Sequence, residues 1–322
     1  MAIKVVKPGL STTVQDLGRP GYYNIGIPIS GGMDRFALRA ANMLVGNREG
    51  LAVLEAVFMG PDLEFTEDAT VAVTGAELPP KVNGELRSTW TSFKVKKGQT
   101  LSFDFLKKGA RAYIAVSGGI DVPVVLGSRS TYTRGALGGH EGRKLAAGDK
   151  LKIGKGRAAK EGRRVPEKLH RMPDTPAQLR MIPGLYWHRI TAEAGQHFLA
   201  DTWKVAPEAD RIGYRFKGGR ALDFVARTPP FGAGSDPSNI VDACYPYGSI
   251  QIPSGTEPIV LHRDAVSGGG YFMVGAVISA DMDLIGQLQP HTPAQFVSVT
   301  MTQAIKARKD RHKLLDRIRD AF

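Results

Sequence analysis

Four glycine-containing segments carry the side chains best suited to binding or chemistry. The first, Gly18–Asn47, reads GRPGYYNIGIPISGGMDRFALRAANMLVGN and leads from a loop into an amphipathic helix that begins at the N-cap Asp34. A helix N-terminus after a glycine-rich loop offers backbone N–H groups and a favourable dipole to an anion. Ser30, Gly31 and Gly32 are therefore candidate substrate-binding residues, and Asp34 is a candidate catalytic carboxylate for positioning or acid–base work. The same spacing also fits a tight turn that caps a packing helix.

The second segment joins Ser117–Asp121 (SGGID) to the run LGSRST that follows it. Arg129 offers a planar fork suited to a carboxylate or a phosphate, so we take it as the second candidate catalytic residue. The hydroxyl groups of Ser128 and Thr131 are candidate substrate ligands beside it. A surface loop with a solvated arginine is the alternative interpretation.

The third and fourth segments lie in the second half of the chain. Arg215 closes the run ADRIGYR and could clamp an anion, although an ion pair with Asp210 explains the pattern equally well. Gln251 in GSIQIP and Tyr271 in SGGGY follow strand-like runs, where binding sites often gather, and both are candidate substrate-binding residues. Gln251 could also be a core amide with its hydrogen bonds satisfied.

Several familiar catalytic motifs are missing. The sequence has no GxxxxGK[ST] phosphate loop and no GxSxG nucleophile elbow. Its seven histidines form no HxxxH or HExxH pair, so we expect no metal site. A self-contained ATPase or hydrolase site of a familiar type is therefore not expected.

The elements that would position these residues are mainly short strands, since 38 glycines and 20 prolines favour turns over long helices. In the run GQTLSFDF, alternation places Leu101, Phe103 and Phe105 on one face of a strand over 100–105. One helix is expected after Asp34 and another over 302–322. The other expected strands are 3–6, 63–65, 71–74, 94–95, 111–116, 150–153, 179–182, 187–191, 203–205, 250–252, 259–261, 272–278 and 295–299. This pattern predicts a mainly β chain of barrels or sandwiches.

The loss of apolar periodicity after Gly154 suggests three regions. We expect an N-terminal β-rich lobe over 1–154, a basic linker or excursion over 155–176, and a C-terminal lobe over 177–322 that ends in a helix.

Composition and charge limit the cellular setting. The chain has a single cysteine, Cys244, no signal-peptide pattern and no run of roughly 18 to 20 apolar residues, so we expect a cytoplasmic protein without a membrane partner. The net charge of +12 is concentrated around 150–171 and 306–313, where basic runs are usually solvated faces. No nucleic-acid-binding motif accompanies them, so no nucleic-acid partner is expected.

Taken together, the motifs resemble a known family, that of the biotin-dependent carboxyltransferases and allophanate hydrolase subunit 2, and the form is most similar to the C subunit of bacterial 5-oxoprolinase. The motifs occur in family order over nearly the whole chain: GIPISGGMD at 26–34, SGGID at 117–121, LGSRST at 126–131, DRIGYR at 210–215, GSIQIP at 248–253 and GGGY at 268–271. The resemblance implies two lobes of cyclophilin-like β-barrel architecture with few helices.

The resemblance also implies activity within a complex. The leading hypothesis is one component of an ATP-dependent 5-oxoprolinase that hydrolyses the lactam of 5-oxoproline to glutamate. The chain would be inactive alone and would be partnered by an A-type subunit and a homologous B-type subunit, and ATP would be held by the complex. One alternative is a carboxyltransferase subunit of a biotin-dependent urea or amide carboxylase, with biotin on a separate carrier. A second alternative is a non-catalytic regulator that binds a kinase-inhibitor homologue.

Overall fold

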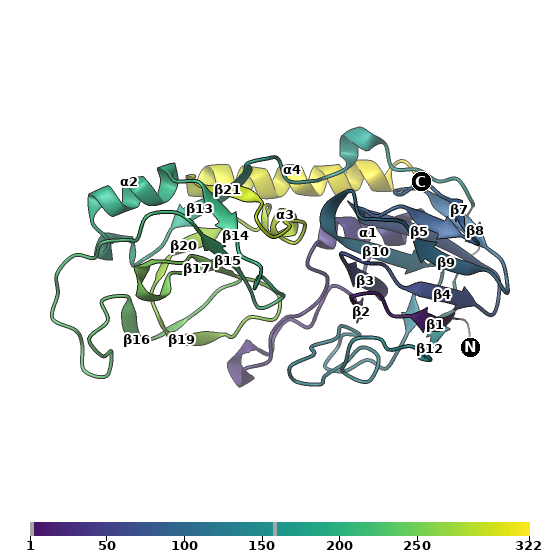
Figure 1. The fold of residues 1–322 in the computed structure, drawn as a ribbon, viewed down its shortest axis with the longest axis horizontal. Helices are drawn as coiled ribbons and strands as arrows, with labels where there is room; N and C mark the ends of the chain where they lie inside the picture. The colour runs from purple at the N-terminus through teal and green to yellow at the C-terminus, as the bar shows by residue number, and fades with distance from the viewer. Residues whose placement is uncertain (1–2, 157–159) are drawn as a thin grey trace. The chain divides into compact units, whose positions relative to one another are not determined.

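The computed structural model describes residues 3–156 and 160–322 of the chain. The chain divides into two compact units (Figure 1). The first unit contains Met1–Pro20, Ser30–Met172 and His312–Phe322, and the second contains Gly21–Ile29 and Pro173–Arg311. Residues 157–159 of the expected basic segment lie outside the described residues.

The first unit is built from two antiparallel sheets. The larger sheet has the strand order β11-β12-β1-β4-β9-β6-β7, and the smaller has the order β2-β3-β10-β5-β8. The strands are β1 (Ile3–Lys7), β2 (Ser11–Gln15), β3 (Val53–Val57), β4 (Asp62–Phe65), β5 (Ala69–Glu77), β6 (Pro80–Val82), β7 (Glu85–Leu86), β8 (Ser92–Val95), β9 (Thr100–Phe103), β10 (Lys108–Val116), β11 (Ile120–Asp121) and β12 (Lys150–Ile153).

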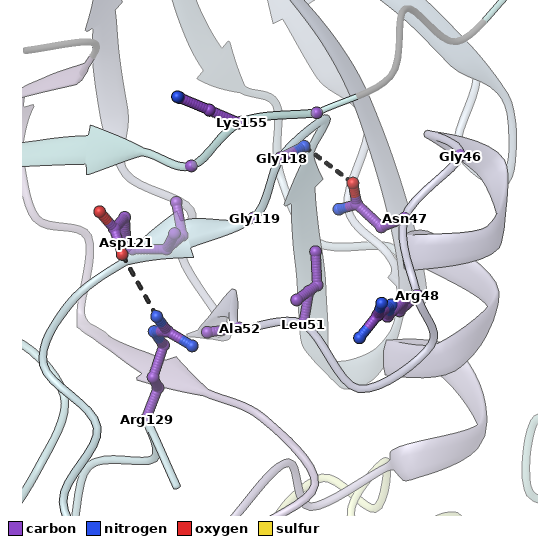
Figure 2. Close-up of a pocket in the computed structure, with 13 residues that line it drawn as sticks. Gly46, Asn47, Arg48, Leu51, Ala52, Gly118, Gly119, Asp121, Arg129 and Lys155 are labelled. Atoms are coloured by element: carbon purple, nitrogen blue, oxygen red, sulfur yellow. Dashed lines mark hydrogen bonds and ion pairs between the residues drawn. The ribbon is translucent and has the colours of Figure 1, made fainter.

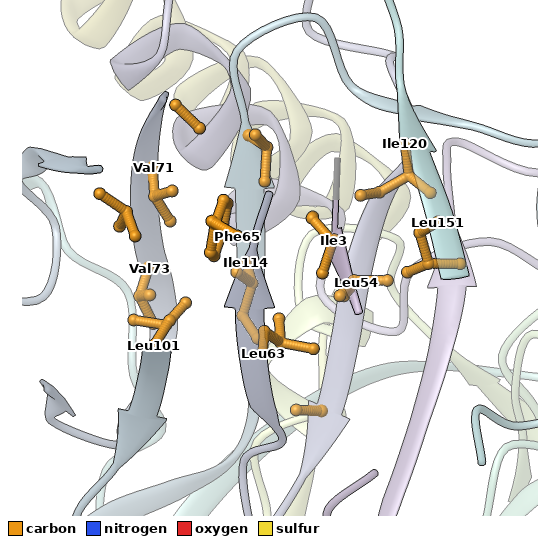
Figure 3. Packing of buried hydrophobic residues seen from close by; sticks show 14 of the residues in the cluster. Ile3, Leu54, Leu63, Phe65, Val71, Val73, Leu101, Ile114, Ile120 and Leu151 are labelled. Atoms are coloured by element: carbon orange, nitrogen blue, oxygen red, sulfur yellow. The ribbon is translucent and has the colours of Figure 1, made fainter. Parts of the chain in front are cut away.

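A hydrophobic core fills the space between these sheets (Figure 3). Ile3 and Phe65 enter it from the larger sheet, and Val73 and Ile114 enter it from the smaller one. Because side chains alternate along a strand, Tyr113, next to Ile114, points to the opposite face of the smaller sheet.

A helix, α1 (Arg35–Leu44), covers that opposite face and forms a second core with it. Asp34 caps the helix, since its side chain accepts a hydrogen bond from the N–H of Ala37, as the capping pattern predicts. Leu315 near the C-terminus is buried in the same core. Val165 and Leu169, from the segment expected to be a linker, are buried there too, and Val165 N–H donates to the carbonyl of Trp90.

The second unit contains a closed barrel with the strand order β13-β20-β17-β18-β15-β14-β21, and a separate ribbon of β16 and β19. The barrel confirms the mainly β prediction. The strands are β13 (Ala177–Pro183), β14 (Trp203–Val205), β15 (Gly213–Lys217), β16 (Asn239–Cys244), β17 (Ser249–Gln251), β18 (Ile259–Leu261), β19 (Gly268–Tyr271), β20 (Met273–Val277) and β21 (Pro293–Ser298). The helices are α2 (Ala192–Ala200), α3 (Met282–Ile285) and α4 (Met301–Arg319), and α4 contributes residues to both units. Short 3-10 turns are η1 (Tyr23–Ile25), η2 (Glu167–Leu169), η3 (Trp187–Arg189) and η4 (Pro253–Gly255).

Two details of the sequence prediction are wrong. The expected strand at 187–191 is instead η3 followed by Thr191, which caps α2 by accepting from the N–H of Ala194. Bulky residues at 187–191 favour a strand by propensity, but the local cap decides otherwise. The strand through Leu101 ends at Phe103, and Phe105 lies 90% exposed in the loop beyond it.

None of the described helices has the length and apolar character needed to cross a membrane.

Candidate functional site

A cavity of about 750 Å³ opens in the first unit where several loops meet. Its wall includes the residues that follow α1, the turn between β10 and β11, the loop that carries Arg129, and the segment after β12 (Figure 2). The lining residues are Gly46, Asn47, Arg48, Leu51, Ala52, Gly118, Gly119, Ile120, Asp121, Arg129, Gly154, Lys155 and Gly156.

Arg129 is fixed at the cavity wall by three hydrogen bonds. Its Nε donates to the carbonyl of Val122 at 2.8 Å. One terminal nitrogen lies 3.3 Å from the carboxylate of Asp121 (Figure 2). Its backbone N–H donates to Asp16 Oδ2 at 2.6 Å. The side chain remains 33% exposed, so the guanidinium is oriented but still open to a ligand.

Asp16 holds the Arg129 loop through its carboxylate. Oδ1 accepts from the hydroxyl groups of Ser128 at 2.6 Å and Ser130 at 2.5 Å, and from the backbone N–H of Gly18 at 2.7 Å. The carbonyl of Asp16 also accepts from the N–H of Gly32 at 3.0 Å. One residue therefore ties the first and second glycine-containing segments together.

Asn47 ties the end of α1 to the glycine turn of the cavity. Its Oδ1 accepts from the N–H of Gly118 at 2.8 Å (Figure 2). Its Nδ2 donates to the carbonyl of Val116 at 2.9 Å. Gly118 has φ +98, and a Cβ there would lie 2.0 Å from the carbonyl oxygen of Gly154, so only glycine fits. The N–H of Gly119 donates to Val116 as well. Both glycine N–H groups are thus used within the fold.

The charges around the cavity favour an anion. Arg48, Arg129 and Lys155 line it, and Asp121 is the acidic residue among the lining residues. Arg48 and Lys155 are exposed to solvent, so their charges are not destabilised by burial and both side chains are accessible to a ligand. Because the glycine N–H groups are engaged, side-chain cations rather than a backbone nest would hold a carboxylate or phosphate here.

Asp34 lies in a different setting, since it is 2% exposed and is not among the cavity-lining residues. Its carboxylate accepts from the N–H of Ala37 at 2.9 Å, and its own N–H donates to the hydroxyl of Tyr113 at 2.7 Å. That hydroxyl donates in turn to Glu55 at 2.7 Å. Burial, and then the charges of Glu55 and Asp34, raise the pKa of Tyr113 well above its usual value, so Tyr113 stays a neutral donor.

The remaining candidates of the first unit pack inside the loops that shape the cavity. Thr131 donates from its hydroxyl to the carbonyl of Val14 at 3.0 Å, and Ser128 donates to Asp16. Ser30 is fully buried with φ +54, and its Oγ has no hydrogen-bond partner among residues 3–156 and 160–322. A Cβ on Gly31 would lie 2.8 Å from the nitrogen of Gly18, which explains the glycine at that position.

The candidates of the second unit form a separate group. Arg215 makes an ion pair of 2.5 Å with Glu257, and not with Asp210. Gln251 is 7% exposed and hydrogen-bonds Tyr245, whose hydroxyl donates to the carbonyl of Tyr271 at 2.8 Å and accepts from its N–H at 2.8 Å. Burial raises the pKa of Tyr245, which keeps it protonated.

Comparison with known proteins shows which family the chain belongs to. The sequence profile of the carboxyltransferase domain, subdomain A and B, matches residues 25–298. The chain belongs to this carboxyltransferase domain family. It is 34% identical to the C subunit of 5-oxoprolinase from Escherichia coli K12, over 98% of this chain and 97% of that protein.

Other relatives of this carboxyltransferase-family chain are much longer. It is 33% identical to the urea amidolyase of Saccharomyces cerevisiae over 96% of this chain but 17% of that protein. The crystal structure of the K. lactis urea amidolyase superposes with a TM-score of 0.92 at 33% identity, over 98% of this chain and 20% of that one. The family therefore includes free-standing subunits and parts of larger polypeptides.

Three residues of the site have no local sequence signal: Asp16, Arg48 and Lys155. Each follows a helix or strand and has a glycine within two positions of it. Many loops of this chain share that pattern, so it is a weak signal. Their importance follows only from the convergence of these ends in the first unit. Within the described residues, no group of three or more His, Cys, Asp or Glu side chains could hold a metal ion.

Proposed function

We propose that this chain is one component of a 5-oxoprolinase-like complex, which opens the lactam of 5-oxoproline to glutamate with hydrolysis of ATP. The observation that carries the proposal is the cation-lined cavity of the first unit, with Arg48, Arg129 and Lys155 around it. 5-Oxoproline carries a carboxylate, whereas urea is neutral, so this cavity complements the first better than the second. The end-to-end similarity to the 5-oxoprolinase C subunit supports the same assignment.

Arg129 is the central binding group in this proposal. Its guanidinium is oriented by Val122 and Asp121, so little conformational entropy is lost when it binds an anionic oxygen. Arg48 and Lys155 would bind further oxygens of the substrate or of a phosphate. Asp16 holds the Arg129 loop in place, and Asp34 holds the start of α1.

ATP would be bound within the complex. Its phosphates would be bound by the same side-chain cations, which are strong charge-assisted donors to phosphate oxygens. The N–H groups of Gly118 and Gly119 would not take part, because they already donate within the fold. When bound, ATP would supply the activation that a stable amide carbonyl needs before water can attack it. This chain contributes orientation and charge to that step.

A carboxyltransferase subunit of a biotin-dependent urea or amide carboxylase is the second candidate. The superposition on K. lactis urea amidolyase over 98% of this chain favours it. The same cations would then bind the carboxylate that is transferred, and biotin would arrive on a separate carrier protein.

The deciding experiment is co-expression with the homologous subunits, followed by measurement of ADP release with 5-oxoproline or with urea. We expect ATP turnover that depends on 5-oxoproline and is insensitive to avidin. Urea-dependent, avidin-sensitive turnover would instead establish the carboxyltransferase, and no turnover with either compound would favour a regulator.

Arg129→Ala tests the site itself. We expect a loss of at least about tenfold in kcat/KM, because a charge-assisted hydrogen bond contributes about 1.5–3 kcal/mol. Arg134→Ala is the matched control, because Arg134 is an exposed arginine of the same loop outside the cavity lining. Equal activity of the two variants, both with native circular dichroism, would remove Arg129 from the mechanism.

A further inference from the structure

Two arginines of the second unit lie together, and no carboxylate among residues 3–156 and 160–322 pairs with either of them. Arg189 in η3 is 8% exposed, and Arg227 lies half-buried in the loop that follows β15. Both guanidinium groups donate to one oxygen, the carbonyl of Asn239, at 3.3 Å from Arg189 and 2.6 Å from Arg227. Two like charges are therefore held within hydrogen-bonding reach of a single acceptor.

Their other contacts are neutral. Arg189 also donates to the carbonyl of Pro237 and lies 5.7 Å from the ring centroid of Phe272. The Nε atoms of Arg189 and Arg227 are buried and have no hydrogen-bond partner among the residues that the structure describes. No carboxylate lies within ion-pair distance of either arginine in the same described part of the chain.

This arrangement has an electrostatic cost. Burial, and then the positive charge of Arg227, lower the pKa of Arg189. A desolvated cation normally has an ionic partner, and burial without one is unfavourable. A bound anion would offset both the desolvation and the repulsion between the two guanidinium groups.

A cavity of about 670 Å³ lies beside the pair. Arg227, Val225 and Pro237 are among its lining residues. Arg189 lies behind this lining, and its carbonyl accepts from the N–H of Val225 at 2.8 Å. Asp236 also lines this cavity, but its carboxylate accepts from the N–H and hydroxyl of Ser238 and from the hydroxyl of Ser254. Asp223 is the other acidic lining residue, and it is exposed.

We propose that Arg189 and Arg227 form a binding site for a phosphate group in the second unit. Two planar guanidinium groups with unused N–H donors suit a tetrahedral dianion. Its two negative charges match the two positive charges of the arginines. The phosphate could be inorganic or the end of a small phosphate monoester. This site shares no residue with the cavity at Arg129 and does not depend on the proposed enzymatic activity.

The test is phosphate binding to the full chain carrying Arg129→Ala, so that the first cavity contributes little. Calorimetry and thermal unfolding are run with inorganic phosphate, glycerol phosphate, sulfate and acetate at matched ionic strength. We expect phosphate or its monoester to bind and to raise Tm, because a ligand of the native state stabilises it. If inorganic phosphate binds more tightly than glycerol phosphate, the natural ligand is the free ion, and the reverse order indicates a phosphate monoester.

Arg227→Gln in this background should weaken phosphate binding at least about tenfold, as expected for the loss of a charge-assisted hydrogen bond. In phosphate-free buffer the same variant should be as stable as its parent or more stable, since one of two repelling charges is gone. Arg308→Gln, an exposed arginine of α4, is the control and should keep full phosphate binding.

Four outcomes would overturn the proposal. The first is the absence of binding at about 10 mM phosphate or monoester, a concentration that would raise Tm measurably for a specific site. The second is unchanged binding in Arg227→Gln. The third is acetate binding as tightly as phosphate. The fourth is a loss of stability in Arg227→Gln that is equal with and without phosphate, which would show that the arginines only support the loop.

Discussion

Among single residues, Asp16 has a carboxylate that connects several loops of the first unit. Asp16 accepts hydrogen bonds from two hydroxyl groups and two backbone N–H groups, and all four donors belong to segments that shape the cavity. Leaving a buried donor without an acceptor costs more free energy than a typical hydrogen bond contributes. Removing the Asp16 carboxylate should therefore destabilise these loops.

Asp16→Ala should therefore lower the free energy of unfolding by about 3 kcal/mol, since several part-buried donors lose their acceptor at once. Urea unfolding measures the change. Glu85→Ala, at a largely exposed carboxylate of the same unit, is the control and should change little. A loss no greater than in this control would show that water replaces the carboxylate.

Gly31 illustrates a steric requirement at a single position. It has φ +90, and a Cβ there would lie 2.8 Å from the nitrogen of Gly18 and 2.9 Å from the carbonyl carbon of Leu17. Gly84 has a similar φ of +88, but a Cβ there would meet nothing within 4 Å.

We expect Gly84→Ala to cost about 1 kcal/mol, the usual penalty for a left-handed backbone. Gly31→Ala should cost at least about 3 kcal/mol, because it adds a backbone collision to the same penalty. Thermal or urea unfolding of both variants gives the comparison. Equal losses would mean that the loop around Gly31 can move aside.

Among the secondary-structure elements, β12 is preceded by a turn that an ion pair fixes. Arg143 donates to both carboxylate oxygens of Asp149, at 2.7 Å and 2.9 Å, and the N–H of Ala146 donates at 2.8 Å. The hydrogen bonds from Arg143, as the largest cause, lower the pKa of Asp149 to about 2. The carbonyl of Asp149 accepts from Val5 in β1, which connects this turn to the larger sheet.

Because the folded state lowers this pKa, the pair stabilises the protein fully above the ordinary carboxyl value near 4. The contribution is lost as the pH falls from about 4 to 2. Arg143→Gln should remove about 1 kcal/mol at neutral pH, and its stability should fall less steeply than that of the parent over this range. Parallel pH profiles of the two proteins would contradict this account.

For the molecule as a whole, the net charge of +12 is the dominant physical feature. Like charges repel in the compact state, and many of the ion pairs that offset them are exposed and therefore weak. Added salt screens both the repulsion between like charges and the attraction within ion pairs. The repulsion is the larger of the two because it is summed over the whole chain.

Raising NaCl from about 10 to about 200 mM should therefore increase Tm by a few degrees, because screening relieves repulsion over the Debye length. Differential scanning calorimetry measures the shift, with chloride used so that no phosphate enters. A fall in Tm would show that the attractive ion pairs outweigh the repulsion.

Local patterns in the sequence were enough to predict the strand-rich class, most strand positions and the helix that begins at Asp34, because alternation, turn glycines and capping act over a few neighbouring residues. They also placed Arg129 and Asp121 in segments that line the first cavity. The prediction for 187–191 failed because a cap outweighs strand propensity there.

Which of these residues meet follows from the tertiary fold alone. Asp16 reaches the hydroxyl of Ser130 across 114 positions, and Arg189 in η3 and Arg227 in the loop after β15 converge on Asn239. Such contacts depend on strand order and register, which are set by the packing of the whole core. The local sequence around the contacting residues therefore does not predict them.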